Sequence, residues 1–102
     1  MGKVLKLNPH RIQTKIIDEA ARIIKRGGII IYPTDTIYGI GCDAFNKEAV
    51  RNIFRIKRRN EHNPMLVLVN NIEMLRELVD EMTPLALTLS KDFWPGPLTM
   101  IF

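Results

Sequence analysis

Residues 29–42 read I-I-I-Y-P-T-D-T-I-Y-G-I-G-C, and this stretch decides the fold. Its first four residues are three isoleucines and a tyrosine, which is typical of a short buried strand. Pro33 ends that strand, and P-T-D-T at 33–36 has the composition of a turn. Residues 37–42 read as a second extended segment, which we expect Gly39 and Gly41 to bend or bulge. The stretch therefore predicts two strands joined by a polar turn.

Helical patterns lie on both sides of these strands. Apolar residues recur at helical spacing from Ile12 to Ile24, and Gly27-Gly28 is typical of a helix C-terminus. Asn46 is suited to cap a second helix, which runs into basic residues at 57–59. Met65 to Val69 is apolar throughout and predicts a central strand.

The rest of the chain continues the alternation of helix and strand. We expect a third helix over residues 72–81, and a fourth that starts at Thr83-Pro84 and ends near Asp92. F-W-P-G-P at 93–97 predicts a rigid aromatic loop, and residues 98–102 begin another strand. Strands that alternate with helices predict a layered α/β domain with a largely covered sheet.

Composition narrows the class of protein. With 102 residues, 46% of them hydrophobic and 25% charged, the chain has room for one ordinary globular domain. No apolar run approaches the roughly 18–20 residues of a membrane span, and no signal-peptide pattern opens the sequence. We expect a cytoplasmic protein, since the one cysteine, Cys42, cannot form an internal disulfide. Neither Cys42 nor His10 or His62 has zinc-ligand spacing, so we expect no zinc site. The net charge of +4 favours anionic partners such as nucleotides or RNA.

A basic cluster stands at the end of the second predicted helix. Arg51 and Arg55 precede three consecutive cations, Lys57, Arg58 and Arg59. One interpretation is that they only stabilise the helix dipole, by about 0.3–1 kcal/mol each. Three adjacent cations exceed what that role requires, so the cluster favours phosphate binding. Arginine provides a planar fork for phosphate oxygens and lysine a mobile point charge.

Two further segments have both a structural and a functional interpretation. The turn at 33–36 is an ordinary turn by composition, yet Thr34, Thr36 and Tyr38 place three hydroxyls at a strand end, where open α/β sheets bind ligands. Phe93 and Trp94 can stack on a base, although a hydrophobic plug fixed by two prolines is the favoured interpretation. The sequence has no G-x-x-x-x-G-K-[ST] loop, and G-I-G at 39–41 lacks the third glycine of a dinucleotide fingerprint.

Four linked motifs resemble the YrdC-type threonylcarbamoyl-AMP synthase family, also called TsaC. They are G-G-I-I-I-Y-P-T-D-T-I-Y-G-I-G-C-D-A, A-V-x-x-I-F-x-I-K-R-R, N-P-M-L-V-L-V and F-W-P-G-P-L-T. The resemblance implies a three-layer α/β fold with a twisted mixed sheet and a concave basic cavity. It also implies that residues 1–102 are the N-terminal part of a single YrdC-like domain about twice as long. The family's Ser-x-Asn signature does not occur in this sequence, where the nearest string is S-K-D at 90–92.

The resemblance implies a reaction as well. Such enzymes make threonylcarbamoyl-AMP and pyrophosphate from L-threonine, bicarbonate or CO₂, and ATP, with Mg²⁺ held by the ATP phosphates and no metal site in the protein. Downstream proteins transfer the threonylcarbamoyl group to tRNA, and tRNA is a further candidate partner. Lys57 and Arg59 are then the catalytic residues, and Thr34, Thr36 and Tyr38 contact threonine. The implied nucleotide-binding residues are Lys57, Arg58, Arg59, Asn60 and Asn63.

The implied mechanism has two steps. The threonine amine attacks CO₂ or bicarbonate to give a carbamate, whose oxygen then attacks the α-phosphate of ATP. Positioned cations would stabilise the charge on the phosphoryl oxygens. Three alternatives remain: an RNA-binding module of the same fold without adenylation, a relative that performs another carbamoyl transfer, and an inactive truncated paralogue.

Overall fold

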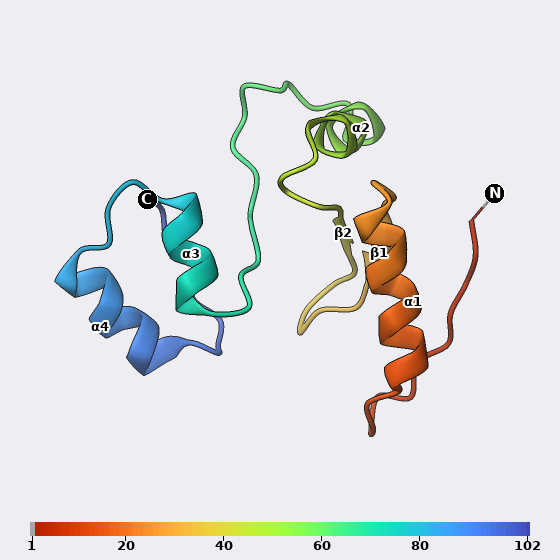
Figure 1. The fold of residues 1–102 in the computed structure, drawn as a ribbon, viewed down its shortest axis with the longest axis horizontal. Coiled ribbons are helices and arrows are strands. Elements are labelled where there is room, and N and C mark those ends of the chain that lie inside the picture. The colour runs from red at the N-terminus through yellow and green to blue at the C-terminus, as the bar shows by residue number, and fades with distance from the viewer. Residues whose placement is uncertain (1) are drawn as a thin grey trace. The chain divides into compact units, whose positions relative to one another are not determined.

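The computed structural model describes residues 2–102 and divides into two compact units, one ending at Met65 and the other spanning Leu66–Phe102. Figure 1 shows their elements. The first unit contains α1 (Thr14–Lys25), β1 (Ile30–Tyr32), β2 (Gly39–Gly41) and α2 (Lys47–Lys57), and the second contains α3 (Ile72–Leu78) and α4 (Pro84–Phe93).

The two predicted strands around the polar turn are present as β1 and β2. They pair antiparallel, with Ile31 opposite Ile40 and Tyr32 opposite Gly39. This register is unbroken, so the predicted bulge is wrong. The glycines have a different role, because a Cβ at Gly39 or Gly41 would lie 2.9 Å from the ring of Tyr32. The ring lies over both glycines, and the absence of side chains there makes room for it.

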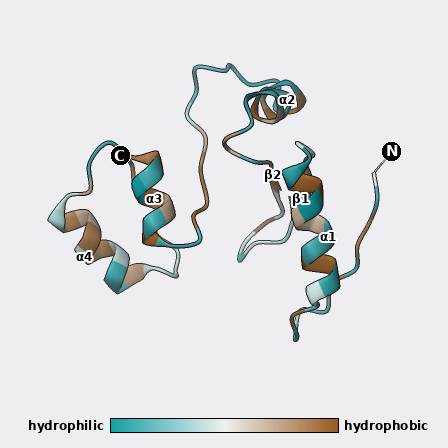
Figure 2. Cartoon of the chain, in the orientation of Figure 1, coloured by the Kyte–Doolittle hydropathy of each residue, from teal (hydrophilic) through white to brown (hydrophobic). Residues whose placement is uncertain are grey.

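Helix α1 packs against β1 and ends as its sequence predicts. Figure 2 shows alternating hydrophobic and hydrophilic bands along it. Gly27 has a φ of 85° and donates its N–H to Ile24, while Gly28 donates to Ile23, both at 2.9 Å. This pair of bonds is the Schellman motif, which favours glycine because an L side chain is strained at positive φ.

Helix α2 supplies the core of the first unit. The Asn46 Oδ1 accepts a hydrogen bond from the Ala49 N–H at 3.1 Å, which confirms the predicted cap. Ala49, Ile53 and Phe54 are the buried residues of this helix, and Ile53 is only 1% exposed. The spacing of these residues places them on one face of α2, so the basic residues of the helix lie outside the core.

The second unit is built from two short capped helices. Asn71 caps α3 through the Met74 N–H at 2.8 Å, and Thr83 caps α4 through the Ala86 N–H at 3.1 Å. Helix α3 ends at Leu78, three residues short of the predicted end, because the extended backbone of Val79 stops it. Helix α4 runs to Phe93, one residue past the predicted end.

Two predicted strands are wrong. Residues 65–69 and 98–102 have no regular secondary structure. A strand needs a hydrogen-bonded neighbour, and the sheet found within residues 2–102 has two strands, β1 and β2. The largely covered sheet that the sequence predicts is not found either, because a two-stranded sheet covers few apolar side chains. Ile31 in β1 is 71% exposed, and Leu66 is 66% exposed. No helix among residues 2–102 is both long enough and apolar enough to cross a membrane.

Candidate substrate-binding site

The polar turn between β1 and β2 is held by its own threonines. The Thr34 hydroxyl donates a short hydrogen bond to the Ile37 carbonyl and accepts one from the Thr36 N–H at 3.2 Å. The two threonine hydroxyls lie 3.5 Å apart. A hydroxyl has one donor and two acceptor positions, so Thr34 has little hydrogen-bonding capacity left for a ligand.

Of the three residues predicted to contact threonine, Thr36 and Tyr38 have hydroxyls that are better placed than that of Thr34 to form hydrogen bonds with a ligand. Thr36 uses its hydroxyl only in the 3.5 Å contact with Thr34, and the Tyr38 side chain is 72% exposed. Within residues 2–102 the turn therefore presents two hydroxyls to solvent, and Thr34 shapes the turn that presents them.

The end of α2 brings the basic residues together through an unusual backbone. Arg58 has φ 50° and ψ 46°, the left-handed conformation that usually requires glycine. Its N–H donates to Arg55 at 3.1 Å, and the Arg59 N–H donates to Phe54 at 2.9 Å. This is the Schellman motif seen at the end of α1, with arginine in place of glycine. Lys57 and Arg59 therefore lie on either side of a sharp change in chain direction.

The next residues form a second tight turn. The Asn60 side-chain oxygen accepts from the His62 N–H at 2.9 Å, and the Asn63 N–H donates to the Asn60 carbonyl at 3.0 Å. Both asparagines are exposed. The five predicted nucleotide-binding residues thus lie at the last residue of α2 and in the two turns that follow it.

The cations at the end of α2 have no acidic partner in the part of the chain that the structure describes. Lys57, Arg58 and Arg59 are exposed, and none of them forms an ion pair within residues 2–102. Arg55 differs, because its guanidinium donates to the Asn52 side chain at 3.1 Å. A group of exposed cations beside hydrogen-bonded turns, without ion pairs among the described residues, is suited to bind phosphate oxygens.

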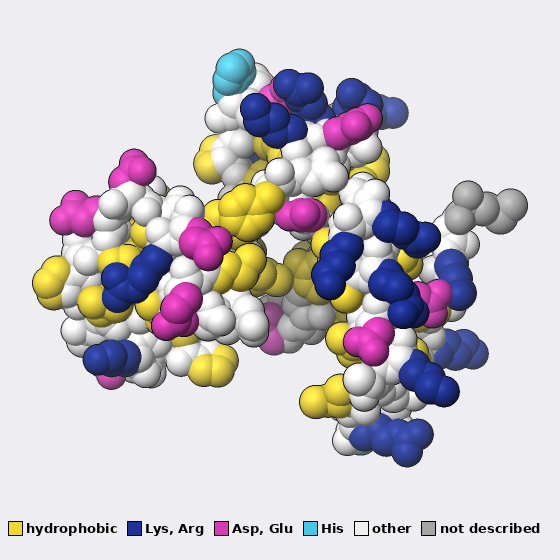
Figure 3. Space-filling model, in the orientation of Figure 1, with side chains coloured by type: hydrophobic (Ala, Val, Ile, Leu, Met, Phe, Trp, Pro, Cys, Tyr) yellow, Lys and Arg dark blue, Asp and Glu magenta, His cyan; other side chains and the backbone are white. Residues whose placement is uncertain are grey.

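Positive charge is concentrated in the first unit as a whole. Residues 1–65 contain thirteen lysines and arginines against six aspartates and glutamates, whereas residues 66–102 contain two against five. Figure 3 shows lysine and arginine side chains gathered along α1 and α2. The basic character predicted for the whole chain therefore belongs to the first unit.

The structure does not join the two halves of the predicted site. In Figure 1 the turn that holds Thr34 and Thr36 lies at the end of the hairpin away from α2. No hydrogen bond or ion pair within residues 2–102 links that turn to Lys57 or Arg59. That they form the threonine and nucleotide ends of one cavity remains a prediction.

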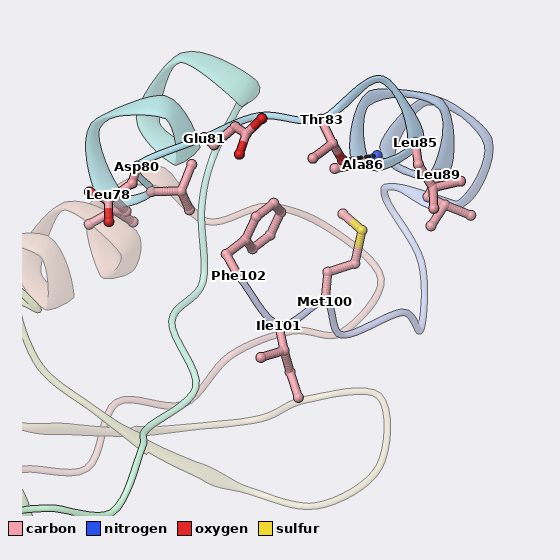
Figure 4. A pocket seen from close by; sticks show the side chains of 11 residues that line it. Leu78, Asp80, Glu81, Thr83, Leu85, Ala86, Leu89, Met100, Ile101 and Phe102 are labelled. Atoms are coloured by element: carbon pink, nitrogen blue, oxygen red, sulfur yellow. Dashed lines mark hydrogen bonds between the residues drawn. The ribbon is translucent and has the colours of Figure 1, made fainter.

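A pocket lies elsewhere, in the second unit. It has a volume of about 530 Å³ and is lined by residues of 78–89 and 100–102. Figure 4 shows Met100 and Phe102 pointing into it and Ile101 pointing away. It contains none of the predicted site residues, and its lining is mainly apolar but includes Asp80 and Glu81.

Two titratable groups of the first unit have shifted pKa values. Burial, with a smaller contribution from the charge of Asp43, raises the pKa of the Cys42 thiol. The hydrogen bond from Lys3, at 2.5 Å, lowers the pKa of Glu19 on α1. A raised pKa keeps Cys42 protonated and weakly nucleophilic.

Within residues 2–102 no three histidine, cysteine or acidic side chains are grouped closely enough to hold a metal ion.

Comparison with known proteins identifies the family. The Sua5/YciO/YrdC family, described as telomere recombination, matches residues 22–102. The chain belongs to this family. The match includes every residue predicted to bind threonine or nucleotide.

Individual relatives agree with this assignment. A threonylcarbamoyl-AMP synthase of Coxiella burnetii is 36% identical over 87% of the chain, and one of Pyrococcus abyssi is 40% identical over 89%. A crystal structure of P. abyssi Sua5 complexed with L-threonine matches 84% of the chain with a TM-score of 0.80 and 38% identity. The predicted YrdC-like fold is confirmed by this match.

The relatives are much longer than the matched region. The chain covers 48% of the Coxiella protein, 27% of the P. abyssi protein and 25% of a Bacillus subtilis threonylcarbamoyl-AMP synthase. It therefore spans about half the length of the first of these relatives and about a quarter of the others.

Proposed function

We propose that this protein acts in the synthesis of threonylcarbamoyl-AMP from L-threonine, bicarbonate or CO₂, and ATP. The observation that carries the proposal is its 36–40% identity to threonylcarbamoyl-AMP synthases of three organisms over more than four fifths of the chain. The exposed cations at the end of α2, which form no ion pair within residues 2–102, support it, because an ATP substrate needs such groups for its phosphates. Downstream proteins would pass the threonylcarbamoyl group to tRNA.

Two groups of residues in the first unit would each bind one substrate. Thr36 and Tyr38 would bind threonine through their hydroxyls, and Thr34 would hold the turn in place. Lys57 and Arg59 would contact the ATP phosphates, with Arg58, Asn60 and Asn63 nearby. Orienting the two substrates against each other would supply much of the rate enhancement, because bound reactants gain effective molarity.

The proposed chemistry requires no covalent enzyme intermediate. The threonine nitrogen attacks CO₂, loses a proton and becomes a carbamate. A carbamate oxygen attacks the α-phosphorus of ATP, the bond to the β-phosphate oxygen breaks, and pyrophosphate leaves. Lys57 and Arg59 would stabilise the negative charge on the phosphoryl oxygens. Mg²⁺ carried by the ATP phosphates would neutralise further charge.

RNA binding without adenylation is a second candidate. The observation in its favour is the charge of residues 1–65, where cations outnumber anions thirteen to six. Binding that falls steeply with salt, without ATP turnover, would support this candidate over the synthase.

The experiment is release of pyrophosphate from ATP that depends on both threonine and bicarbonate. One arm uses this chain alone, and a second adds the part of the Coxiella relative that this chain does not match. That part alone, and reactions without threonine or in CO₂-free buffer, are the controls. We expect release above all controls in at least one arm. Background release in both arms, together with no measurable threonine binding, would rule out the synthase proposal.

A further inference from the structure

We propose that the last turn of α1 holds a second anion-binding site, formed by Arg22, Lys25 and Arg26, which takes a compact multivalent phosphate such as pyrophosphate. The site shares no residue with the proposed threonine and nucleotide sites. The inference therefore goes beyond the proposed function and does not depend on it.

The helix brings the three cations of this site to one place. Residues three and four positions apart on a helix are neighbours on its surface, and Arg22 has Lys25 and Arg26 at these two spacings. The Arg26 N–H donates to the Arg22 carbonyl at 3.1 Å, so the backbone holds these two residues one turn apart. The Schellman bonds of Gly27 and Gly28 close the helix directly after them.

The side chains surround a hollow. Together with Glu19, the three cations line a volume of about 390 Å³. Arg22, Lys25 and Arg26 are exposed, and none of them forms an ion pair within residues 2–102. Their N–H groups are therefore available to phosphate oxygens, which arginine binds through its planar fork.

The carboxylate in the hollow is already compensated. Glu19 pairs with Lys3 at 2.5 Å. The hydrogen bond from Lys3 is the main cause of the lowered pKa of Glu19, and the charges of Arg22 and Arg26 lower it further. Lys3 thus offsets the repulsion that Glu19 would exert on an anion. The four cations and one carboxylate leave a net charge of +3.

The lining of the hollow indicates the class of ligand. No aromatic side chain lines it, so nothing there can stack on a base, and a phosphate without a nucleoside fits best. An extended nucleic-acid strand is less suited, because Asp18 and Glu19 interrupt the basic surface of α1. Figure 3 shows acidic side chains among the lysines and arginines along this helix.

Cations in the last turn of a helix also stabilise its dipole, a role that requires no ligand. Calorimetric titration with pyrophosphate separates the two roles. The chain for this test carries Lys57→Gln and Arg59→Gln, which remove the phosphate contacts proposed at the end of α2. We expect it to bind one pyrophosphate with a dissociation constant of about 1 mM or lower. Absence of binding would overturn the inference.

Two matched double variants of that chain locate the site. Arg22→Gln with Arg26→Gln should weaken pyrophosphate binding at least about tenfold, because both guanidinium groups are removed. Arg11→Gln with Lys15→Gln removes the same charge from exposed positions outside the hollow and should change the affinity less than about twofold. Equal weakening by the two pairs would show a response to net charge alone and would overturn the inference.

A second pair of variants tests the carboxylate. Glu19→Gln should strengthen pyrophosphate binding at least about threefold, because a negative charge leaves the hollow, whereas Asp18→Asn, outside it, should have an effect below about twofold. Equal effects of the two substitutions would contradict the assigned site.

Adenosine diphosphate tests the class of ligand in the same chain. It should bind no more than about threefold more tightly than pyrophosphate, since the hollow offers no surface for the base. A larger gain would overturn the assigned class. Pyrophosphate binding at α1 in a chain without synthase activity would leave the inference standing and count against the proposed function. Synthase activity without binding at α1 would do the reverse.

Discussion

Arg58 and Gly27 occupy equivalent positions at the ends of two helices in the same unit. Both have positive φ, 50° and 85°, and both are followed by a residue whose N–H reaches back to close a Schellman motif. Glycine adopts this conformation without strain, whereas an L-residue pays about 1–2 kcal/mol. Strained residues cluster at functional sites, and Arg58 lies between the two predicted catalytic residues.

Replacing Arg58 with glycine should therefore stabilise the protein. We expect Arg58→Gly to raise the free energy of unfolding by about 0.5–1 kcal/mol, because the left-handed strain is relieved and part of the gain is lost to backbone entropy. Urea denaturation gives the measurement. Gly27→Ala is the matched control, since it introduces the same strain at α1 and should be destabilising. A decrease in stability for Arg58→Gly would show that the arginine side chain contributes more than its backbone costs.

Substitution of the cations beside Arg58 should weaken the binding of ATP. Lys57→Ala and Arg59→Ala should each weaken ATP binding by about 10- to 100-fold, because a hydrogen bond to a charged group is worth about 1.5–3 kcal/mol. They should also abolish pyrophosphate release and leave the circular dichroism spectrum unchanged. Arg51→Ala, on the exposed face of α2, should be near neutral. Calorimetric titration with ATP separates these outcomes, and full affinity in either site variant would exclude that residue.

The two threonines of the turn should respond differently to substitution. Thr34→Val removes the hydroxyl that holds the turn and should lower the free energy of unfolding by about 0.5–1.5 kcal/mol as well as weaken threonine binding. Thr36→Val should weaken threonine binding with little change in stability. Calorimetric binding of L-threonine and thermal denaturation give the two readouts. Equal stability loss in both variants would contradict the roles assigned to the hydroxyls.

At the scale of elements, local signals in the sequence were sufficient for the helices and for the β1–β2 hairpin, but not for the two strands predicted further along the chain. The caps at Asn46 and Thr83 were predicted because each depends on residues three positions away. The strands predicted at 65–69 and 98–102 failed because pairing depends on distant segments, which an apolar run does not specify. The left-handed Arg58 could not be predicted, since nothing in K-R-R replaces the glycine signal. The threonines were predicted on a turn and the cations at the end of a helix, and the structure has both there, but their approach to each other depends on tertiary structure.

The hairpin gives a prediction at this scale. Gly39→Ala places a methyl group 2.9 Å from the Tyr32 ring and should lower the free energy of unfolding by about 1–2 kcal/mol. The loss should shrink in a Tyr32→Ala background, where the ring is absent. Thermal denaturation of the four proteins in this double-mutant cycle gives the coupling energy, which should exceed about 0.5 kcal/mol. Additive effects would show that Gly39 is required for backbone reasons instead.

At the scale of the whole molecule, charge is divided between the units. Residues 1–65 are strongly basic and residues 66–102 are acidic, so polyanions should bind the first unit and avoid the second. Most of the exposed cations of the first unit lie on or next to α1 and α2, and only those at the end of α2 match the family's predicted nucleotide site. Binding of single-stranded RNA at different salt concentrations can distinguish a localised site from a diffuse basic surface.

If the end of α2 is the polyanion site, replacing Lys57, Arg58 and Arg59 together with glutamine should flatten the salt dependence of RNA binding. Each phosphate contact contributes about 0.7 to the slope of log K against log salt for single strands, so the slope should fall by about 2. Glutamine at Lys15, Arg22 and Lys25 of α1 removes the same charge and should change the slope by less than about 0.5. Fluorescence anisotropy between 50 and 200 mM salt, roughly the range over which such slopes are measured, provides the data. An equal decrease of the slope in the two triple variants would show that RNA binding depends on the net charge of the first unit, and that the end of α2 is not a localised RNA-binding site.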